Sequence, residues 1–221
     1  MSESHPWLKN YPAGVPANVD LDQYRSIVSV LQQSCDQFRS RPAFENMGKR
    51  ISYDELDRLS QQFAAYLLLH LKLKKGDRVA LMLPNVLQYP IAIFGALRAG
   101  LTVVNTNPMY TARELKHQLV DSGAVAIVVL ENFAHVLAEV VADTPVRHVV
   151  VTGVGDLLGF PKAMIVNAVL KHIKKAIPDY RIDGVTRFTE ALALGQGMRL
   201  PETDIAPSDI AFLQYTGGTT G

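Results

Sequence analysis

Cysteine is nearly absent from this chain of 221 residues, which contains a single one, Cys35. One cysteine cannot form an internal disulfide, and the N-terminus shows no secretory leader, so the sequence predicts a reducing, cytoplasmic compartment. Net charge is nearly absent too, because 22 basic and 21 acidic residues leave only +1, which gives no electrostatic basis for nucleic-acid binding. With 48% hydrophobic residues, this low charge excludes an intrinsically disordered chain.

The chain also lacks an uninterrupted apolar run that could cross a membrane. Its longest stretch without charged residues, 79–97, has the length of a membrane span. Pro84, Asn85 and the segment 88–90 interrupt this stretch, which favours a strand, a turn and a buried helix over a transmembrane helix.

Metal-ligand and dinucleotide-binding patterns are missing as well. The six histidines are scattered without the spacing of metal ligands, so we expect structural or surface roles for them. The glycines of segment 153–159 follow a predicted strand but miss the dinucleotide-binding spacing by one residue, which argues against NAD. Asp54, Glu55 and Asp57 open a predicted helix, where capping explains these carboxylates better than catalysis does.

What the sequence does contain is a regular alternation of short apolar strands and helical patterns. Strands separated by helices are typical of a parallel sheet with both faces covered, so we expect an α/β fold with a mostly parallel sheet flanked by helices. Capping-box spacing at Ser52–Glu55 and Thr111–Glu114 predicts two helix N-termini. We expect a hairpin over 43–52, and strands over 78–83, 101–105, 124–130, 147–151 and 209–215. We expect helices over 28–38, 88–99, 112–122, 134–141, 162–177 and 186–194, and one that begins after Ser52 and ends before Lys74.

Composition divides the chain into three parts. Residues 1–27 contain a proline-rich, aperiodic stretch and are expected to form an N-terminal arm. Residues 28–221 are expected to form an α/β portion, which a basic helical insert interrupts at about 156–184. The predicted helix of this insert either rests on anionic lipid or packs against its own domain, and its exposed cluster comprises Lys171, Lys174 and Lys175.

The last predicted strand runs directly into Thr-Gly-Gly-Thr-Thr-Gly at 216–221. Glycines let the backbone approach an anion and direct several N–H groups toward it. The hydroxyl groups of Thr216, Thr219 and Thr220 add donors for phosphate oxygens, or a ligand for Mg²⁺. No Gly-Lys-[Ser/Thr] is present, so this is not the common phosphate loop, and a flexible Gly/Thr linker is the alternative.

Segment 215–221 resembles the first half of the adenylate-forming signature [YF]-[ST]-[SG]-G-T-T-G-x-P-K-G. Other segments resemble the same superfamily in the same order: 51–56 (ISYDEL), 76–80 (GDRVA), 84–85 (PN), 97–100 (LRAG) and 105–108 (NTNP). Within that superfamily the chain resembles bacterial long-chain fatty-acid–CoA ligases, through the basic insert and through YPAGVP (11–16), LPNVLQYP (83–90), NTNPMYTARELKHQ (105–118) and QYTGGTTG (214–221). The resemblance covers essentially the whole chain.

The resemblance implies a two-step reaction. A long-chain fatty acid and ATP give acyl-AMP and pyrophosphate, and CoA then displaces AMP. It also implies Mg²⁺, with Thr216 as a candidate ligand, and leaves open a homodimer and a peripheral contact with the inner face of an anionic membrane. The sequence departs from many relatives in having glycine rather than serine at position 217. The implied ATP phosphate-binding residues are Tyr215, Thr216, Gly217, Gly218, Thr219, Thr220 and Gly221.

Enzymes of this family are more than twice as long, so we expect this chain to be an N-terminal fragment that is inactive by itself. Two alternatives remain: a catalytically silent binding or regulatory domain, and a fatty-acyl–AMP ligase that transfers nothing to CoA. Residues 105–110 follow a predicted strand, where they either line a ligand pocket or only form a turn.

Overall fold

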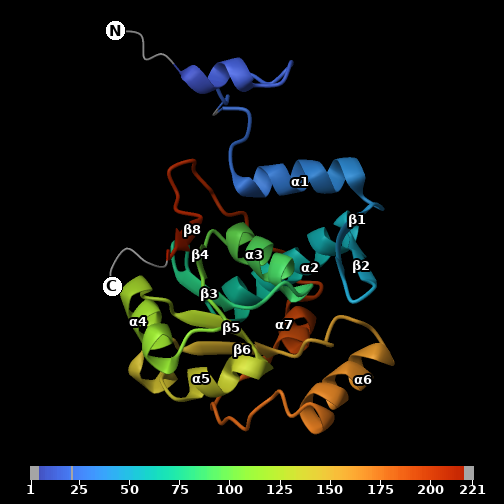
Figure 1. Ribbon diagram of the computed structural model, residues 1–221, viewed down its shortest axis with the longest axis vertical. Coiled ribbons are helices and arrows are strands. Elements are labelled where there is room, and N and C mark those ends of the chain that lie inside the picture. The colour runs from blue at the N-terminus through green and yellow to red at the C-terminus, as the bar shows by residue number, and fades with distance from the viewer. Residues whose placement is uncertain (1–4, 21, 217–221) are drawn as a thin grey trace.

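The computed structural model describes residues 5–20 and 22–216. A six-stranded sheet lies at the centre of the fold, with helices on either side of it (Figure 1). Every pair of neighbouring strands is parallel, and the order is β7-β6-β5-β3-β4-β8. This confirms the predicted α/β fold with a mostly parallel sheet. The strands are β3 (Arg78–Met82), β4 (Thr102–Asn105), β5 (Ala126–Leu130), β6 (His148–Thr152), β7 (Thr186–Arg187) and β8 (Phe212–Gln214).

Helices cover both faces of this sheet because its strands are apolar on both sides. In β3, Val79 and Leu81 join one core while Ala80 and Met82 join the other, as the period of two requires. The first core is completed by α1 (Ile27–Phe38), α2 (Tyr53–Ala65), α3 (Gln88–Arg98) and α7 (Phe188–Gly195). The second core is completed by α4 (Ala112–Ser122) and α5 (Ala134–Ala138).

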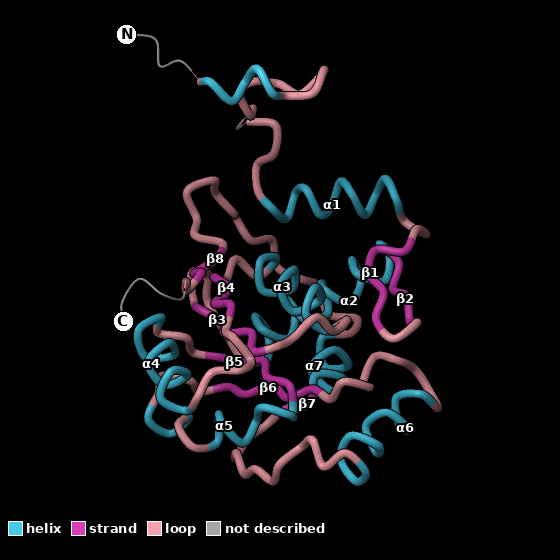
Figure 2. Tube along the Cα trace, in the orientation of Figure 1, coloured by secondary structure: helices cyan, strands magenta, loops and turns pink. Residues whose placement is uncertain are grey.

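A separate hairpin packs beside α2, as Figure 2 shows, and is formed by β1 (Pro42–Asn46) and β2 (Lys49–Ser52). Its turn residues Met47 and Gly48 both have positive φ, 49° and 75°, which is typical of a two-residue hairpin turn. The predicted hairpin is thus confirmed. In the preceding described segments, 5–20 and 22–26, no residue is buried; the division into arm, body and insert stays a prediction.

Both predicted capping boxes are present. Ser52 accepts a bond from the Glu55 N–H at 3.1 Å, and the Glu55 carboxylate accepts one from the Ser52 N–H at 3.0 Å. Thr111 and Glu114 make the equivalent pair at the start of α4. Each box satisfies two N–H groups that the first helical turn leaves without partners, so these helices begin where the spacing predicts.

Three predicted helices are shorter in the structure. The segment 134–141 is helical only as α5, and a 3₁₀ turn, Val141–Asp143, follows it. The segment 162–177 forms α6 (Lys162–Ala168) and a π turn, Val169–Ile173, after which Lys175 takes a positive φ of 49°. Segment 186–194 begins as β7, because Thr186 and Arg187 pair with β6 before α7 starts.

The stretch without charged residues, 79–97, forms most of β3, a turn and most of α3, as predicted. No helix among the described residues is both long enough and apolar enough to cross a bilayer. Because the sheet is parallel, all six strands end at one edge, where ligands of such sheets bind. The chain places β4 on one side of β3 and β5 on the other, so the strand order reverses next to β3.

Candidate functional site

Strand β8 carries the chain to this carboxyl edge. It pairs with β4 in parallel register, with Val104 opposite Leu213 and Asn105 opposite Gln214. Tyr215 and Thr216 follow directly and therefore lie at the edge where parallel sheets bind ligands. The other predicted phosphate-binding residues, Gly217, Gly218, Thr219, Thr220 and Gly221, lie outside the described residues.

Asn105, the last residue of β4, contacts β8 through its side chain. Its Nδ2 donates to Gln214 Oε1 at 2.9 Å, and its Oδ1 accepts from the Tyr89 hydroxyl at 2.9 Å. Asn107 behaves differently, because its Oδ1 accepts from the Met109 N–H at 2.9 Å within its own turn. Within segment 105–110, a turn therefore explains Asn107, whereas Asn105 belongs to the edge that carries the candidate site.

Tyr215 directly follows β8, and its side chain packs against the second core. Its hydroxyl reaches α4, where it donates to Asp121 Oδ2 at 2.5 Å. Burial, together with the hydrogen bond and the negative charge of Asp121, raises the pKa of Tyr215 to about 12. Tyr215 is therefore a neutral hydrogen-bond donor at pH 7, and the contact ties the end of β8 to α4.

Thr216 is exposed at the end of the described chain. The described segments hold no group of three or more His, Cys, Asp or Glu side chains that could bind a metal ion. Mg²⁺ at nucleotide sites is commonly held by one or two protein groups together with substrate phosphates. Thr216 fits the role of one such ligand, which stays a prediction.

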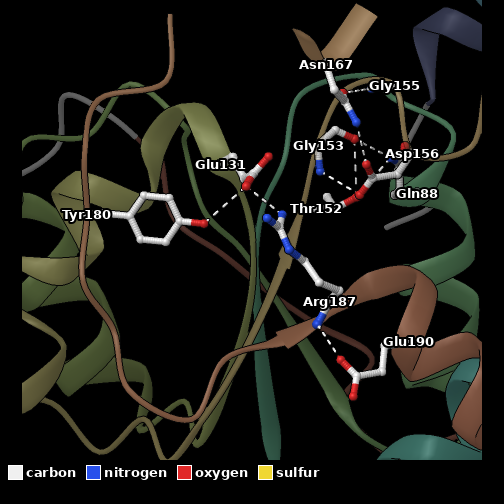
Figure 3. Close-up of polar contacts among 10 residues, drawn as sticks. All are labelled: Gln88, Glu131, Thr152, Gly153, Gly155, Asp156, Asn167, Tyr180, Arg187 and Glu190. Carbon is white, nitrogen blue, oxygen red and sulfur yellow. Dashed lines mark hydrogen bonds and ion pairs between the residues drawn. The ribbon is translucent and has the colours of Figure 1, made fainter. Parts of the chain in front are cut away.

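A second polar cluster lies at the ends of β5, β6 and β7 (Figure 3). Arg187 Nη1 lies 2.5 Å from Glu131 Oε1, and the Tyr180 hydroxyl donates to the same oxygen at 3.3 Å. Arg187 is in β7 and Glu131 directly follows β5, so the ion pair reaches across β6 and connects two strands that do not pair with each other. No local pattern in the sequence predicts this pair, because the two residues lie far apart along the chain.

The same cluster attaches α6 to the sheet. Asp156 accepts from the Gly153 N–H at 2.7 Å, the Thr152 hydroxyl at 3.0 Å and the Asn167 amide at 2.8 Å. A Cβ at Gly155 would lie only 2.6 Å from the backbone oxygen of Ala163. The close approach of α6 therefore explains why the sequence has glycine at 155. The glycines of this segment were the visible sign of the cluster in the sequence.

The acidic start of α2 is explained only in part by capping. Glu55 caps the helix, but Asp57 instead pairs with the Arg98 guanidinium on α3. Arg98 has only 4% of its side chain exposed, and its Nε also donates to Ser60 Oγ at 3.0 Å. The capping interpretation of Asp57 was thus wrong, because a helix from a later part of the chain supplies its partner.

An apolar groove of about 560 Å³ lies at the opposite edge of the sheet. It is formed by the start of α1 and by segment 205–211, beside Gly100 and Leu101, which precede β4. Because it adjoins the amino ends of β4 and β8, it is separated from Thr216 by the length of these strands and belongs to a different part of the molecule.

The family model for AMP-binding enzymes matches residues 31–221. A long-chain-fatty-acid–CoA ligase of Escherichia coli O6:H1 (strain CFT073) is 52% identical over 215 residues, and the match covers 97% of this chain and 38% of that protein. A ligase of the same name from Bacillus subtilis (strain 168) is 34% identical, with 100% and 39% covered. A crystal structure of a long-chain-fatty-acid–CoA ligase from Archaeoglobus fulgidus superposes with a TM-score of 0.70 at 23% identity, covering 96% of this chain and 38% of that one. The chain thus spans about two fifths of the length of these relatives, and it belongs to the AMP-binding enzyme family.

Proposed function

We propose that the protein carrying this chain is an ATP-dependent long-chain fatty-acid–CoA ligase. One observation carries the proposal: a parallel strand, β8, brings Tyr215 and Thr216 to the carboxyl edge of the sheet, and the glycine- and threonine-rich segment follows them. Its support is the 52% identity with a relative of that name. A fatty-acyl–AMP ligase and a catalytically silent binding domain are the alternatives.

In the first step, a carboxylate oxygen of the fatty acid attacks the α-phosphorus of ATP. The bond between the α-phosphorus and the bridging oxygen breaks, and pyrophosphate leaves with the electron pair. The backbone N–H groups and hydroxyls of segment 216–221 are proposed to hold the phosphates and to spread donors over the developing pyrophosphate charge. Mg²⁺, with Thr216 as one ligand, would neutralise part of that charge.

In the second step, the thiolate of CoA attacks the acyl carbonyl carbon, and AMP leaves. Because the chain spans 38% of the length of its 52%-identical relative, we propose that the 221 residues alone do not complete either step. Catalytic groups that act as a unit lose nearly all activity when part of the unit is missing. Acyl-CoA formation from palmitate, ATP and CoA by the purified chain would contradict this proposal.

The test of the phosphate-binding role uses the full-length protein. Thr219→Ala and Thr220→Ala each remove a hydroxyl, and the loss of one such donor can cost about 2–4 kcal/mol at the transition state. ATP–pyrophosphate exchange should therefore slow in both variants, whereas Thr203→Ala, in the loop near the opposite edge, should leave it unchanged. Release of free acyl-AMP without thioester would favour the acyl-AMP ligase, and no exchange at all would favour the silent domain.

A second proposal concerns the surface of α6 and the turn that follows it. Residues 160–175 are all described, and none of them is buried. Phe160 is 87% exposed and Ile173 is 72% exposed, and Met164 and Ile165 are exposed as well. The sequence between 160 and 177 contains four lysines and no acidic residue. This combination of exposed apolar and basic side chains is typical of a helix that lies on an anionic lipid surface.

The arrangement along the helix supports that interpretation over packing on its own domain. Asn167 faces the sheet and contacts Asp156, so the opposite face of α6 is directed outward. Ile165, two residues before Asn167, lies on that opposite face, Met164 is exposed beside it, and Lys171, Lys174 and Lys175 are exposed further along. We propose that these residues bring the enzyme to the inner face of a membrane, where long-chain fatty acids partition.

Sedimentation with anionic vesicles tests this contact. Changing Lys171, Lys174 and Lys175 to Gln should weaken binding strongly at low salt and less at high salt, since each lysine near an anionic surface contributes about 1 kcal/mol that salt screens. Changing the exposed Lys9, Lys72 and Lys74 to Gln alters the net charge equally and should have little effect. Equal loss in both triple variants, or equal binding to neutral vesicles, would contradict the proposal.

We also propose that the protein forms a homodimer. The described N-terminal segment supports this, because Trp7, Tyr11, Val15 and Val19 are large apolar residues that are exposed. Exposed apolar residues gathered on one segment often mark a protein interface. Sedimentation velocity of the full-length protein and of its Trp7→Ser/Tyr11→Ser variant should show a dimer only in the unaltered protein; a monomer in both would contradict the proposal.

A further inference from the structure

The end of β8 is held by side chains on both faces of the sheet. Gln214 is bonded to Asn105 of β4, and the next residue, Tyr215, is bonded to Asp121 of α4. Successive residues of a strand point to opposite faces, so these two contacts hold the strand from two sides. They lie one and two residues before Thr216, the first residue of the proposed phosphate-binding segment.

The Asn105 side chain bridges α3 and β8. Its Oδ1 accepts from the Tyr89 hydroxyl, and its Nδ2 donates to Gln214 Oε1, both at 2.9 Å. The backbone is fixed as well, because the Asn105 carbonyl oxygen accepts from the buried Gln118 amide at 2.9 Å. Tyr89 on α3 and Gln118 on α4 thus hold Asn105 from two helices.

Strand β8 depends on such side-chain contacts because it is short and lies at the end of the described sheet. It comprises Phe212–Gln214, and among the described strands it pairs with β4 alone. The pairing ends at Asn105 and Gln214, so their side-chain bond is the last link between the two strands before the chain leaves the sheet. A bond at that place sets where and in which direction Thr216 departs.

We propose that Asn105 is a positioning residue for the reaction at the ATP phosphates. Through Gln214 it fixes the end of β8, and so the start of the phosphate-binding segment, without touching ATP itself. The inference rests on the proposed function, because it assumes that segment 216–221 binds the phosphates. Groups that stabilise a transition state must be held within a fraction of an ångström, so a looser strand end lowers the rate before it lowers stability.

The experiment uses the full-length protein and measures ATP–pyrophosphate exchange, the KM for ATP, the KM for fatty acid and the melting temperature. Asn105→Ala and Gln214→Ala should each reduce exchange about threefold to tenfold or raise the KM for ATP by that factor, as expected for loss of the hydrogen bond between these two side chains. The KM for fatty acid should not change. Asn107→Ala, whose bond lies within its own turn, is the matched control and should resemble the unaltered protein.

Two further variants separate positioning from a structural role. Asn105→Asp keeps an acceptor for Tyr89, and the Gln214 amide can rotate to donate to the second carboxylate oxygen, so exchange should recover relative to Asn105→Ala. The double variant Asn105→Ala/Gln214→Ala should be no slower than Asn105→Ala, since the contact that Gln214→Ala breaks is already lost in Asn105→Ala. Gln214 is exposed, so its variant is expected to fold even if Asn105→Ala does not.

The outcomes distinguish this inference from the proposed function. If Thr219→Ala and Thr220→Ala leave exchange unchanged, the phosphate-binding role itself fails. If those variants slow exchange but Asn105→Ala and Gln214→Ala do not, only the positioning role fails. The positioning role also fails if the two effects add in full, or if both KM values and the melting temperature shift together.

Discussion

The side-chain amide of Asn167 donates a 2.8 Å hydrogen bond to Asp156 Oδ1, and this bond fastens α6 to the turn after β6. Asn167 Oδ1 in turn accepts from the Gly155 N–H at 2.8 Å. Asp156 also accepts from Thr152, the last residue of β6. Helix α6 is therefore attached to the carboxyl edge of the sheet through two side chains, and Lys162 at its start also donates to the Met47 carbonyl oxygen in the turn of the β1–β2 hairpin.

Removing this attachment should destabilise the protein. Asn167→Ala leaves the Gly155 N–H and one Asp156 oxygen without their partners, and we expect a loss of about 1–3 kcal/mol in the free energy of unfolding. Asn107→Ala, at an exposed turn, should cost less than about 1 kcal/mol. Urea denaturation of the two variants measures both free energies of unfolding. Equal losses would show that the contacts of Asn167 stabilise the protein no more than an exposed turn contact does.

The close approach of α6 gives an independent prediction at Gly155. An added Cβ would lie 2.6 Å from the Ala163 backbone oxygen and 2.7 Å from Asn167 Oδ1, so Gly155→Ala must displace the helix. Overpacking of this kind typically costs about 1–3 kcal/mol. Differential scanning calorimetry should show a lower melting temperature, and an unchanged value would mean that α6 does not approach the turn this closely.

Local signals in the sequence predicted the elements, whereas contacts between distant residues stayed hidden. The box of Ser52 and Glu55 could be predicted because both partners lie within one helical turn. The partner of Asp57 could not, since Arg98 is 41 residues away and its burial depends on how α2 packs against α3. Strand β7 was missed for a different reason: two residues cannot show a period of two, and only their pairing with β6 makes them a strand.

The candidate site likewise combines features that the sequence predicts with contacts that it does not. The glycine- and threonine-rich segment could be identified from its residues. Strand β8 could be predicted because it is an apolar run directly before that segment. The contacts that hold the strand end, Asn105 with Gln214 and Asp121 with Tyr215, join segments 109 and 94 residues apart. No local pattern encodes them, because they depend on the strand order that places β8 next to β4.

The ion pair of Arg98 and Asp57 should contribute to stability because its guanidinium is withdrawn from water. Asp57→Ala leaves the charge of Arg98 without its carboxylate, and breaking such pairs is costly. Asp57 is itself about one-third exposed, so we expect a loss of about 1–3 kcal/mol rather than the larger values of fully buried pairs. The exposed pair of Asp36 and Arg39 is the comparison, and Asp36→Ala should change stability by less than about 1 kcal/mol.

Stability should depend on pH through His148. Burial, reinforced by the neighbouring positive charge of Arg147, lowers the pKa of His148 below its ordinary value of 6.5. As the pH falls below 6.5, the unfolded chain takes up a proton at this position before the folded protein does, so stability decreases. Above pH 6.5 this contribution is fully present. Melting temperatures between pH 8 and pH 5 should fall less steeply in His148→Gln than in the unaltered protein, and parallel curves would contradict the assignment.

The exposed apolar residues of α6 should insert into lipid rather than merely lie near it. Met164→Gln/Ile165→Gln removes two outward apolar side chains and retains every lysine, so vesicle binding should weaken equally at low and high salt. The reason is that apolar burial, at about 25 cal/mol per Å², is not screened by salt. The matched control is Met109→Gln/Ile210→Gln, because these residues are the same types and are exposed elsewhere on the surface. If both double variants bind anionic vesicles as the unaltered protein does, the lysines act without insertion; if both bind more weakly by the same amount, the face of α6 has no special role.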